Sequence, residues 1–115
     1  MLKTHCLTLE LNDDDELIAL YEQYHQPGSV WPEVLVSIAG SGIEHMQIYR
    51  LGTLLVMVLQ VNETFSFEAK ALNDKNNPKV QEWERLMERF QKVASQDGET
   101  SKWQVMKPIF DLQNH

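Results

Sequence analysis

The chain has 115 residues, which is enough for one domain and too few for two hydrophobic cores. Hydrophobic residues make up 43% of it and charged residues 23%, with 5 glycines and 4 prolines, so the composition is globular rather than disordered or collagen-like. A formal net charge of −7 disfavours nucleic acids and anionic membrane surfaces as partners, because both repel an acidic chain.

The cysteine content and the apolar runs indicate where the protein works. A single cysteine, Cys6, excludes an internal disulfide and a cysteine-rich zinc site, and it suits a reducing compartment. The N-terminus shows no secretion signal, and the longest apolar run, residues 54–59, is far too short to span a bilayer. We therefore expect one cytoplasmic domain over residues 1–115.

The chain opens with a strand pattern followed by a helix pattern. Residues 4–11 alternate apolar and polar side chains, as in a strand buried on one face. Residues 12–15 then supply an N-cap and a carboxylate-rich first turn, which the helix dipole favours. The helix that follows should end near His25.

A turn at residues 26–29 leads into a second helix and a second strand. Pro32 stands at the first position of this helix, where its missing N–H costs nothing. Its inner face should consist of Val34, Leu35 and Ile38. Residues 43–50 alternate again, which places Met46 on one face of a strand with Ile48.

The apolar run of residues 54–59 predicts a third strand that is buried on both faces. Helices on one side of a sheet leave its other side open, so a doubly buried strand in a small chain requires a partner subunit. We therefore predict a homodimer.

The second half of the chain predicts two helices and a last strand. Residues 65–73 fit a short helix or an irregular lid. The next helix carries an apolar stripe made of Val80, Trp83, Leu86, Met87 and Phe90. After a polar segment at 92–102, residues 103–112 alternate weakly as a final strand, which Pro108 restricts to a sheet edge. This order predicts an α+β fold: a ferredoxin-like (split βαβ) antiparallel sheet with helices on one face, closed by dimerisation into an α/β barrel.

Metal, nucleotide and covalent chemistry lack a sequence signature. The four histidines, His5, His25, His45 and His115, have no metal-ligand spacing. Phosphate-binding glycine motifs are absent from the sequence, and Cys6 lies in a strand without an evident base. We expect neither a metal nor a cofactor.

One helix carries a more specific pattern. Tyr21 and His25 are four residues apart and therefore share a face. Such a pair is often an ordinary half-buried part of a core. Together with Trp83, which faces the same sheet from another helix, it could also bind a sugar, because aromatic faces beside polar tips suit its CH faces and hydroxyls.

Several motifs in this order resemble the L-rhamnose mutarotase superfamily, especially its L-fucose mutarotase-like branch. They are Tyr21-x-x-x-His25, Trp31-Pro32-Glu33-Val34, Gly42-Ile43-x-x-Met46-x-Ile48-Tyr49, Val80-Gln81-Glu82-Trp83-Glu84 and Lys102-Trp103-x-x-Met106-x-x-Ile109-Phe110. The resemblance implies a homodimeric barrel without metal or cofactor, an isomerase that interconverts the α and β anomers of a monosaccharide, here a 6-deoxyhexose.

The resemblance also implies roles for individual residues. The proton-donating histidine of the family matches His25, and a sugar-contacting tyrosine matches Tyr21. The second aromatic and the Trp-Trp pair of the rhamnose-type branch are matched by Met46 and by Trp83-Glu84, which favours L-fucose over L-rhamnose. His45 and Gln47 replace residues that are usually acidic, on the face turned toward the expected partner.

Mutarotation needs two proton carriers and no covalent intermediate. An imidazole suits the first, His25, because its ordinary pKa of about 6.5 lets it donate and accept near neutrality. For the second carrier the sequence leaves four candidates: Tyr21, Glu33, Glu84 and water. We expect Trp31 to be a structural plug at a helix start.

Two other functions fit the same residues. Cofactor-independent or haem-dependent monooxygenases use dimeric barrels too, and the fold alone does not separate them from mutarotases. A non-catalytic sugar-binding or dimerisation module would also use Tyr21 and Trp83, with His25 only donating a hydrogen bond.

Overall fold

The computed structural model describes residues 2–92 and 103–114, so the polar segment predicted at 92–102 lies almost wholly outside the described residues. The elements in chain order are β1 (Lys3–Glu10), α1 (Asp15–Tyr24), α2 (Pro32–Gly40), β2 (Ile43–Leu51), β3 (Leu54–Val61), α3 (Phe67–Lys75), α4 (Pro78–Glu88), β4 (Gln104–Val105) and a 3₁₀ turn (Leu112–Asn114).

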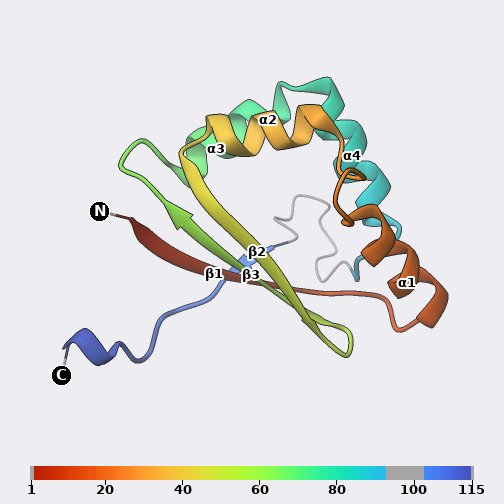
Figure 1. The fold of residues 1–115 in the computed structure, drawn as a ribbon, viewed down its shortest axis with the longest axis horizontal. Coiled ribbons are helices and arrows are strands. Elements are labelled where there is room, and N and C mark those ends of the chain that lie inside the picture. Colours follow the sequence, from red (N-terminus) through yellow and green to blue (C-terminus); the bar gives the residue numbers. More distant parts are fainter. Residues whose placement is uncertain (1, 93–102, 115) are drawn as a thin grey trace.

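The strands form one antiparallel sheet in the order β2-β3-β1-β4. Because β3 is inserted between β1 and β2, this is the split βαβ arrangement. The four helices gather over one face of the sheet, and no described helix covers the other face (Figure 1). The predicted α+β fold is confirmed.

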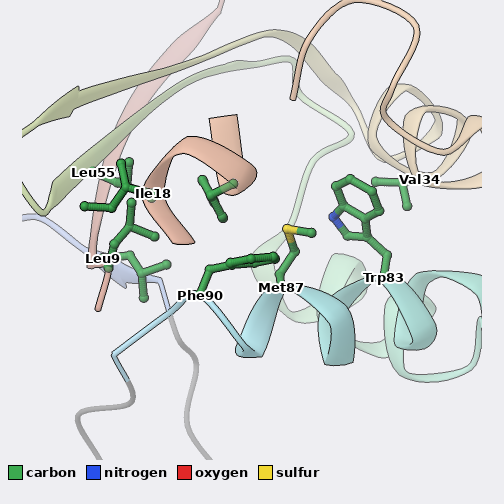
Figure 2. Close-up of a cluster of buried hydrophobic side chains, with 9 residues drawn as sticks. Leu9, Ile18, Val34, Leu55, Trp83, Met87 and Phe90 are labelled. Carbon is green, nitrogen blue, oxygen red and sulfur yellow. The ribbon is translucent and has the colours of Figure 1, made fainter. Parts of the chain in front are cut away.

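The core lies between the helices and the covered face of the sheet. One cluster of buried side chains joins α1, α2 and α4 to the sheet, and a second lies on the sheet around Leu7 and Leu59. Figure 2 shows Trp83 and Met87 of α4 in a row with Phe90, which follows the end of this helix, and Val34 of α2 beside the indole. Trp103 and Ile38 pack against both clusters and so connect them.

A polar network ties three helices together. Lys70 of α3 donates from Nζ to both carboxylate oxygens of Asp74, at 2.7 and 2.6 Å. Ser37 of α2 donates from its hydroxyl to the same carboxylate at 2.8 Å. Gln81 of α4 donates from Nε2 to the backbone oxygen of Asp74 at 2.8 Å. This network holds α2 and α4 in place, and these helices carry Trp31 and Trp83.

The structure corrects two of the expectations. Leu35 is 51% exposed, not part of the core, because Val34 already occupies the single buried stripe of a short helix. The final strand is only Gln104–Val105, since the chain leaves the sheet ahead of Pro108, which has no N–H to donate. Within one chain, Leu55, Leu59 and Val61 of β3 are deeply buried on the face under the helices, and the other face of β3 is the one on which a partner subunit is expected.

Candidate active site

The end of α1 places His25. Asp14 caps the start of this helix, accepting from the backbone N–H groups of Glu16 and Leu17. His25 is the C-cap residue, and its backbone N–H donates to the carbonyl oxygen of Glu22 at 3.1 Å. Glu22 also pairs with Arg50 of β2, which ties the last turns of α1 to the sheet. His25 is therefore held by its own backbone and by its helix.

A backbone hydrogen bond determines the tautomer of His25. Its Nδ1 lies 2.7 Å from the backbone carbonyl oxygen of Tyr21. A carbonyl oxygen can only accept, so Nδ1 carries the hydrogen and donates it. In the neutral imidazole, Nε2 therefore carries the lone pair.

Burial keeps this imidazole neutral. His25 is half-buried, and loss of solvent lowers its pKa below the usual 6.5, an effect that the hydrogen bond to the Tyr21 carbonyl partly offsets. A neutral imidazole with an available Nε2 lone pair is a general base near neutral pH.

Two aromatic rings contact His25, and two more pack on the second of them. The Tyr21 ring lies 4.4 Å from the imidazole, measured between centroids, at an interplanar angle of 33°. The indole of Trp83 lies 5.7 Å away and meets it edge to face. Trp31 packs on that indole at 5.3 Å, and Tyr24 lies 6.2 Å from it. Tyr21, His25 and Trp83, predicted to work together, are therefore neighbours.

Tyr21 is a core residue with a polar tip. It is only 4% exposed, less than the half-buried position that its residue type suggested. Burial raises the pKa of its phenol to about 12, and a side-chain hydrogen bond with Gln91 acts in the opposite direction. The phenol therefore keeps its proton at neutral pH and can act as a hydrogen-bond donor.

The two other predicted site residues lie in different surroundings. Met46 is half-buried and packs against the second core cluster, around Leu7, Ile43, Leu59 and Val61. Glu84 follows Trp83 on α4 and accepts a hydrogen bond from Nε2 of Gln81 at 3.1 Å. A role for Met46 or Glu84 in sugar binding therefore depends on a ligand that extends from His25 to these side chains.

Two residues of this region were missed or undervalued in the sequence. Trp31, expected to be a plug, is the ring that packs closest to the Trp83 indole, and its position in the Trp-Pro-Glu helix start was the available signal. Gln91, which contacts Tyr21, follows the apolar stripe of α4 without any motif of its own.

The structure has a cavity that lies apart from the residues around His25. It has a volume of about 360 Å³, and its lining residues include Lys3, His5, Phe65 and Phe67. None of the predicted site residues lines it. The residues around His25 instead belong to, or pack against, the larger core cluster.

Residues 2–92 and 103–114 contain neither a metal-binding cluster nor a membrane-spanning helix. No three side chains among His, Cys, Asp and Glu lie close enough together there to hold a metal ion. No helix in the same ranges is long and apolar enough to cross a membrane.

His25, Tyr21 and Trp83 together can transfer a proton to and from a ligand that lies against the indole. Nε2 of His25 can accept a proton and return it, and the phenol of Tyr21 can donate a hydrogen bond. The Trp83 indole offers an apolar surface beside them. A small polyol with apolar CH faces is the kind of ligand that such a site suits.

Comparison with known proteins gives relatives along nearly the whole chain. A family model described as L-rhamnose mutarotase matches residues 4–112. An L-fucose mutarotase of Xanthomonas campestris pv. campestris is 44% identical over 107 residues, which cover 93% of this chain and 86% of the relative. A UPF0734 protein of Dictyostelium discoideum is 33% identical over 114 residues, covering 96% of this chain and 90% of that protein.

Solved structures show the same fold. An L-rhamnose mutarotase from Formosa agariphila superposes with a TM-score of 0.71 at 16% identity, covering 96% of this chain and 98% of that one. The tetracenomycin F2 cyclase from Streptomyces glaucescens, a type-II polyketide cyclase, reaches a TM-score of 0.62 at 14% identity, covering 95% of both chains. At these identities the two structures support the fold alone, whereas the family match and the 44% identical relative support the family. The chain belongs to the L-rhamnose mutarotase family.

Proposed function

We propose that the chain interconverts the α and β anomers of a 6-deoxyhexose, with L-fucose preferred over L-rhamnose, and that it does so without a cofactor. The observation that carries the proposal is the hydrogen bond from Nδ1 of His25 to the Tyr21 carbonyl oxygen, which leaves the lone pair of the neutral imidazole on Nε2, in a ring that lies 5.7 Å from the Trp83 indole between centroids. The 44% identical relative bears the name L-fucose mutarotase. Met46 and Glu84, where the rhamnose-type branch has aromatic residues, favour the same sugar.

The proposed reaction opens and closes the sugar ring. Nε2 of His25 accepts the proton of the anomeric hydroxyl while the bond between C1 and the ring oxygen breaks, which leaves an aldehyde at C1. The ring oxygen receives a proton from a second carrier. After rotation about the C1–C2 bond the ring oxygen attacks the other face of the aldehyde, and both protons return. No net proton is gained or lost.

The neighbours of His25 have binding roles in this proposal. The Tyr21 phenol, which keeps its proton at neutral pH, positions the sugar by donating a hydrogen bond. The Trp83 indole stacks on the apolar face of the sugar. Met46 packs against the methyl group of the sugar, a position that suits its adaptable thioether. Glu84 binds the sugar hydroxyls.

Anomer exchange measured by NMR tests the proposal directly. Saturation-transfer rates for L-fucose, L-rhamnose and D-ribose should rise in the presence of the protein, most strongly for L-fucose. A protein that binds L-fucose without accelerating exchange would be a sugar-binding module. Equal rates with and without protein for all three sugars would reject the mutarotase proposal.

The functional unit in this proposal is a homodimer. The strand register turns Cys6, Tyr49, Val56 and Val58 toward the sheet face that carries no helix. Beside them on this face, Leu51 is 80% exposed. Apolar side chains on an open sheet face favour a partner subunit over water. Light scattering at micromolar concentration should give twice the mass of the chain, and a monomer mass would reject the dimer.

We place this enzyme in the cytoplasm, where a free thiol persists. Cys6 is unpaired and half-buried, and it lies on the face of the proposed dimer contact.

A further inference from the structure

Gln91 is a buried polar side chain whose oxygen has no partner in the part of the chain that the structure describes. Only 5% of Gln91 is exposed, and its Oε1 makes no hydrogen bond there. A buried acceptor without a donor costs stability, and in a native protein such an atom calls for an explanation, for example a bound ligand. The hydrogen-bond donor that pairs with Oε1 of Gln91 therefore has to be identified.

The backbone around Gln91 is held rigidly. After α4 ends, the chain runs antiparallel to the end of β1, with a bridge between Leu11 and Gln91. The backbone N–H of Asn12 donates to the carbonyl oxygen of Phe90 at 2.9 Å, and that of Lys92 donates to the carbonyl oxygen of Glu10 at 2.8 Å. The backbone of Gln91, between these two hydrogen bonds, is therefore held at a fixed point beside the end of β1.

The Gln91 side chain meets the phenol of Tyr21. Since Oε1 of Gln91 has no hydrogen-bond partner among the described residues, the side-chain hydrogen bond between Gln91 and Tyr21 runs from the amide nitrogen Nε2 to the phenol oxygen. This leaves the phenol proton and the amide oxygen both available. A donor and an acceptor side by side match a sugar hydroxyl, which can accept from one and donate to the other.

We propose that Gln91 is a substrate-binding residue of the mutarotase: its Oε1 accepts a hydrogen bond from one hydroxyl of the sugar, and its Nε2 aims the Tyr21 phenol at the same hydroxyl. This role rests on the proposed function, since it concerns the sugar bound beside His25. It adds a specificity residue from the end of α4, separate from the aromatic rings.

Deoxy sugars test which hydroxyl Gln91 recognises. The wild-type chain should show a KM for anomer exchange at least about tenfold higher for one of 2-deoxy-, 3-deoxy- and 4-deoxy-L-fucose than for L-fucose, because the missing hydroxyl leaves buried groups unpaired. In Gln91→Met the KM for L-fucose should rise by about tenfold and the penalty for that one deoxy sugar should disappear. The change should fall on KM more than on kcat.

Two further variants support the measurement. Gln23→Met makes the same chemical change at an exposed position of α1 and should keep the wild-type KM and deoxy-sugar pattern. Gln91→Asn keeps an amide but shortens its reach, so it should also lose the discrimination, which covers the case in which Gln91→Met fails to fold.

The outcomes separate the two proposals. Wild-type KM values and an unchanged deoxy-sugar pattern in Gln91→Met, or in Gln91→Asn if Gln91→Met does not fold, would overturn the role of Gln91 while the mutarotase activity stands. Absence of exchange in the wild-type chain would overturn the proposed function itself, and the role of Gln91 with it.

Discussion

The backbone carbonyl oxygen of Tyr21 and Nδ1 of His25 are joined by a hydrogen bond of 2.7 Å, one turn apart on α1. The main chain of the helix therefore sets which imidazole nitrogen carries the hydrogen and which carries the lone pair. Because the Tyr21 side chain also packs against the imidazole, at a centroid distance of 4.4 Å, one residue fixes both the tautomer and the ring position.

Replacing His25 tests its place in the reaction. His25→Ala should reduce anomer exchange of L-fucose by about 100- to 10,000-fold, the usual contribution of a positioned acid–base group. Saturation-transfer NMR measures the rate, and circular dichroism should show an unchanged fold. His5→Ala, which removes a histidine outside this group of residues, should keep the wild-type rate; if His25→Ala keeps it too, the assignment is wrong.

The pH profile follows from the lowered pKa of His25. The neutral imidazole is the active base, so kcat/KM for L-fucose should be level around neutral pH and fall only at pH values below the ordinary histidine pKa of about 6.5. A rate that already falls between pH 8 and 7 would contradict a lowered pKa.

The same pKa shift links stability to pH. The unfolded chain binds a proton at His25 more readily than the folded chain, so protonation of His25 favours unfolding. The stability that neutral His25 contributes is therefore complete above pH 6.5 and is lost as the pH falls through and below that value. Urea denaturation between pH 7.5 and 5 should show a steeper loss of unfolding free energy in the wild type than in His25→Ala. Parallel curves would contradict this.

The indole of Trp83 should contribute to sugar binding beyond its part in the core. Truncation to alanine would cost about 3–5 kcal/mol of stability, so Trp83→Phe is the better variant. We expect it to raise the KM for L-fucose about 2- to 10-fold, which corresponds to an aromatic contact of about 0.5–1.5 kcal/mol. Val80→Ala, another buried position of α4, should lower stability but leave KM unchanged; an equal rise in KM would mean that the effect is only structural.

The Lys70–Asp74 pair should stabilise the fold. Its side chains are only 18% and 16% exposed, and Asp74→Ala would remove the carboxylate that accepts from both the ammonium of Lys70 and the hydroxyl of Ser37, leaving Lys70 with its longer hydrogen bond to Ser37 Oγ. We expect a loss of about 1–3 kcal/mol in the free energy of unfolding, measured by urea denaturation. Lys79→Ala breaks the exposed pair with Glu82 and should cost less than about 1 kcal/mol. Similar losses in both variants would contradict the difference in burial.

A charge on the open sheet face should separate the proposed dimer. Val58→Lys places an ammonium group where two apolar faces would meet, so light scattering should give the mass of one chain while circular dichroism stays the same. Gln23→Lys, on the exposed side of α1, should leave the dimer intact. A Val58→Lys variant that remains dimeric would mean that the subunits meet elsewhere.

Local patterns along the sequence determined the elements and one half of the site. The cap at Asp14, Pro32 at a helix start and the strand alternation each act within a few residues, so these elements were predictable. The spacing of Tyr21 and His25 is likewise local, because residues four apart share a helix face. The roles of Met46 and Glu84 came from the family resemblance and remain predictions.

Only the tertiary structure decided which distant side chains meet. The packing of Trp31 on Trp83, the contact of Gln91 with Tyr21 and the exposure of Leu35 depend on how α2 and α4 lie over the sheet and on where the chain rejoins β1 after Phe90. No local pattern encodes these distances, because they follow from packing between elements that are far apart in the sequence. The helices and strands were therefore predictable from the sequence, whereas the arrangement of side chains around the His25 imidazole depends on how the helices pack.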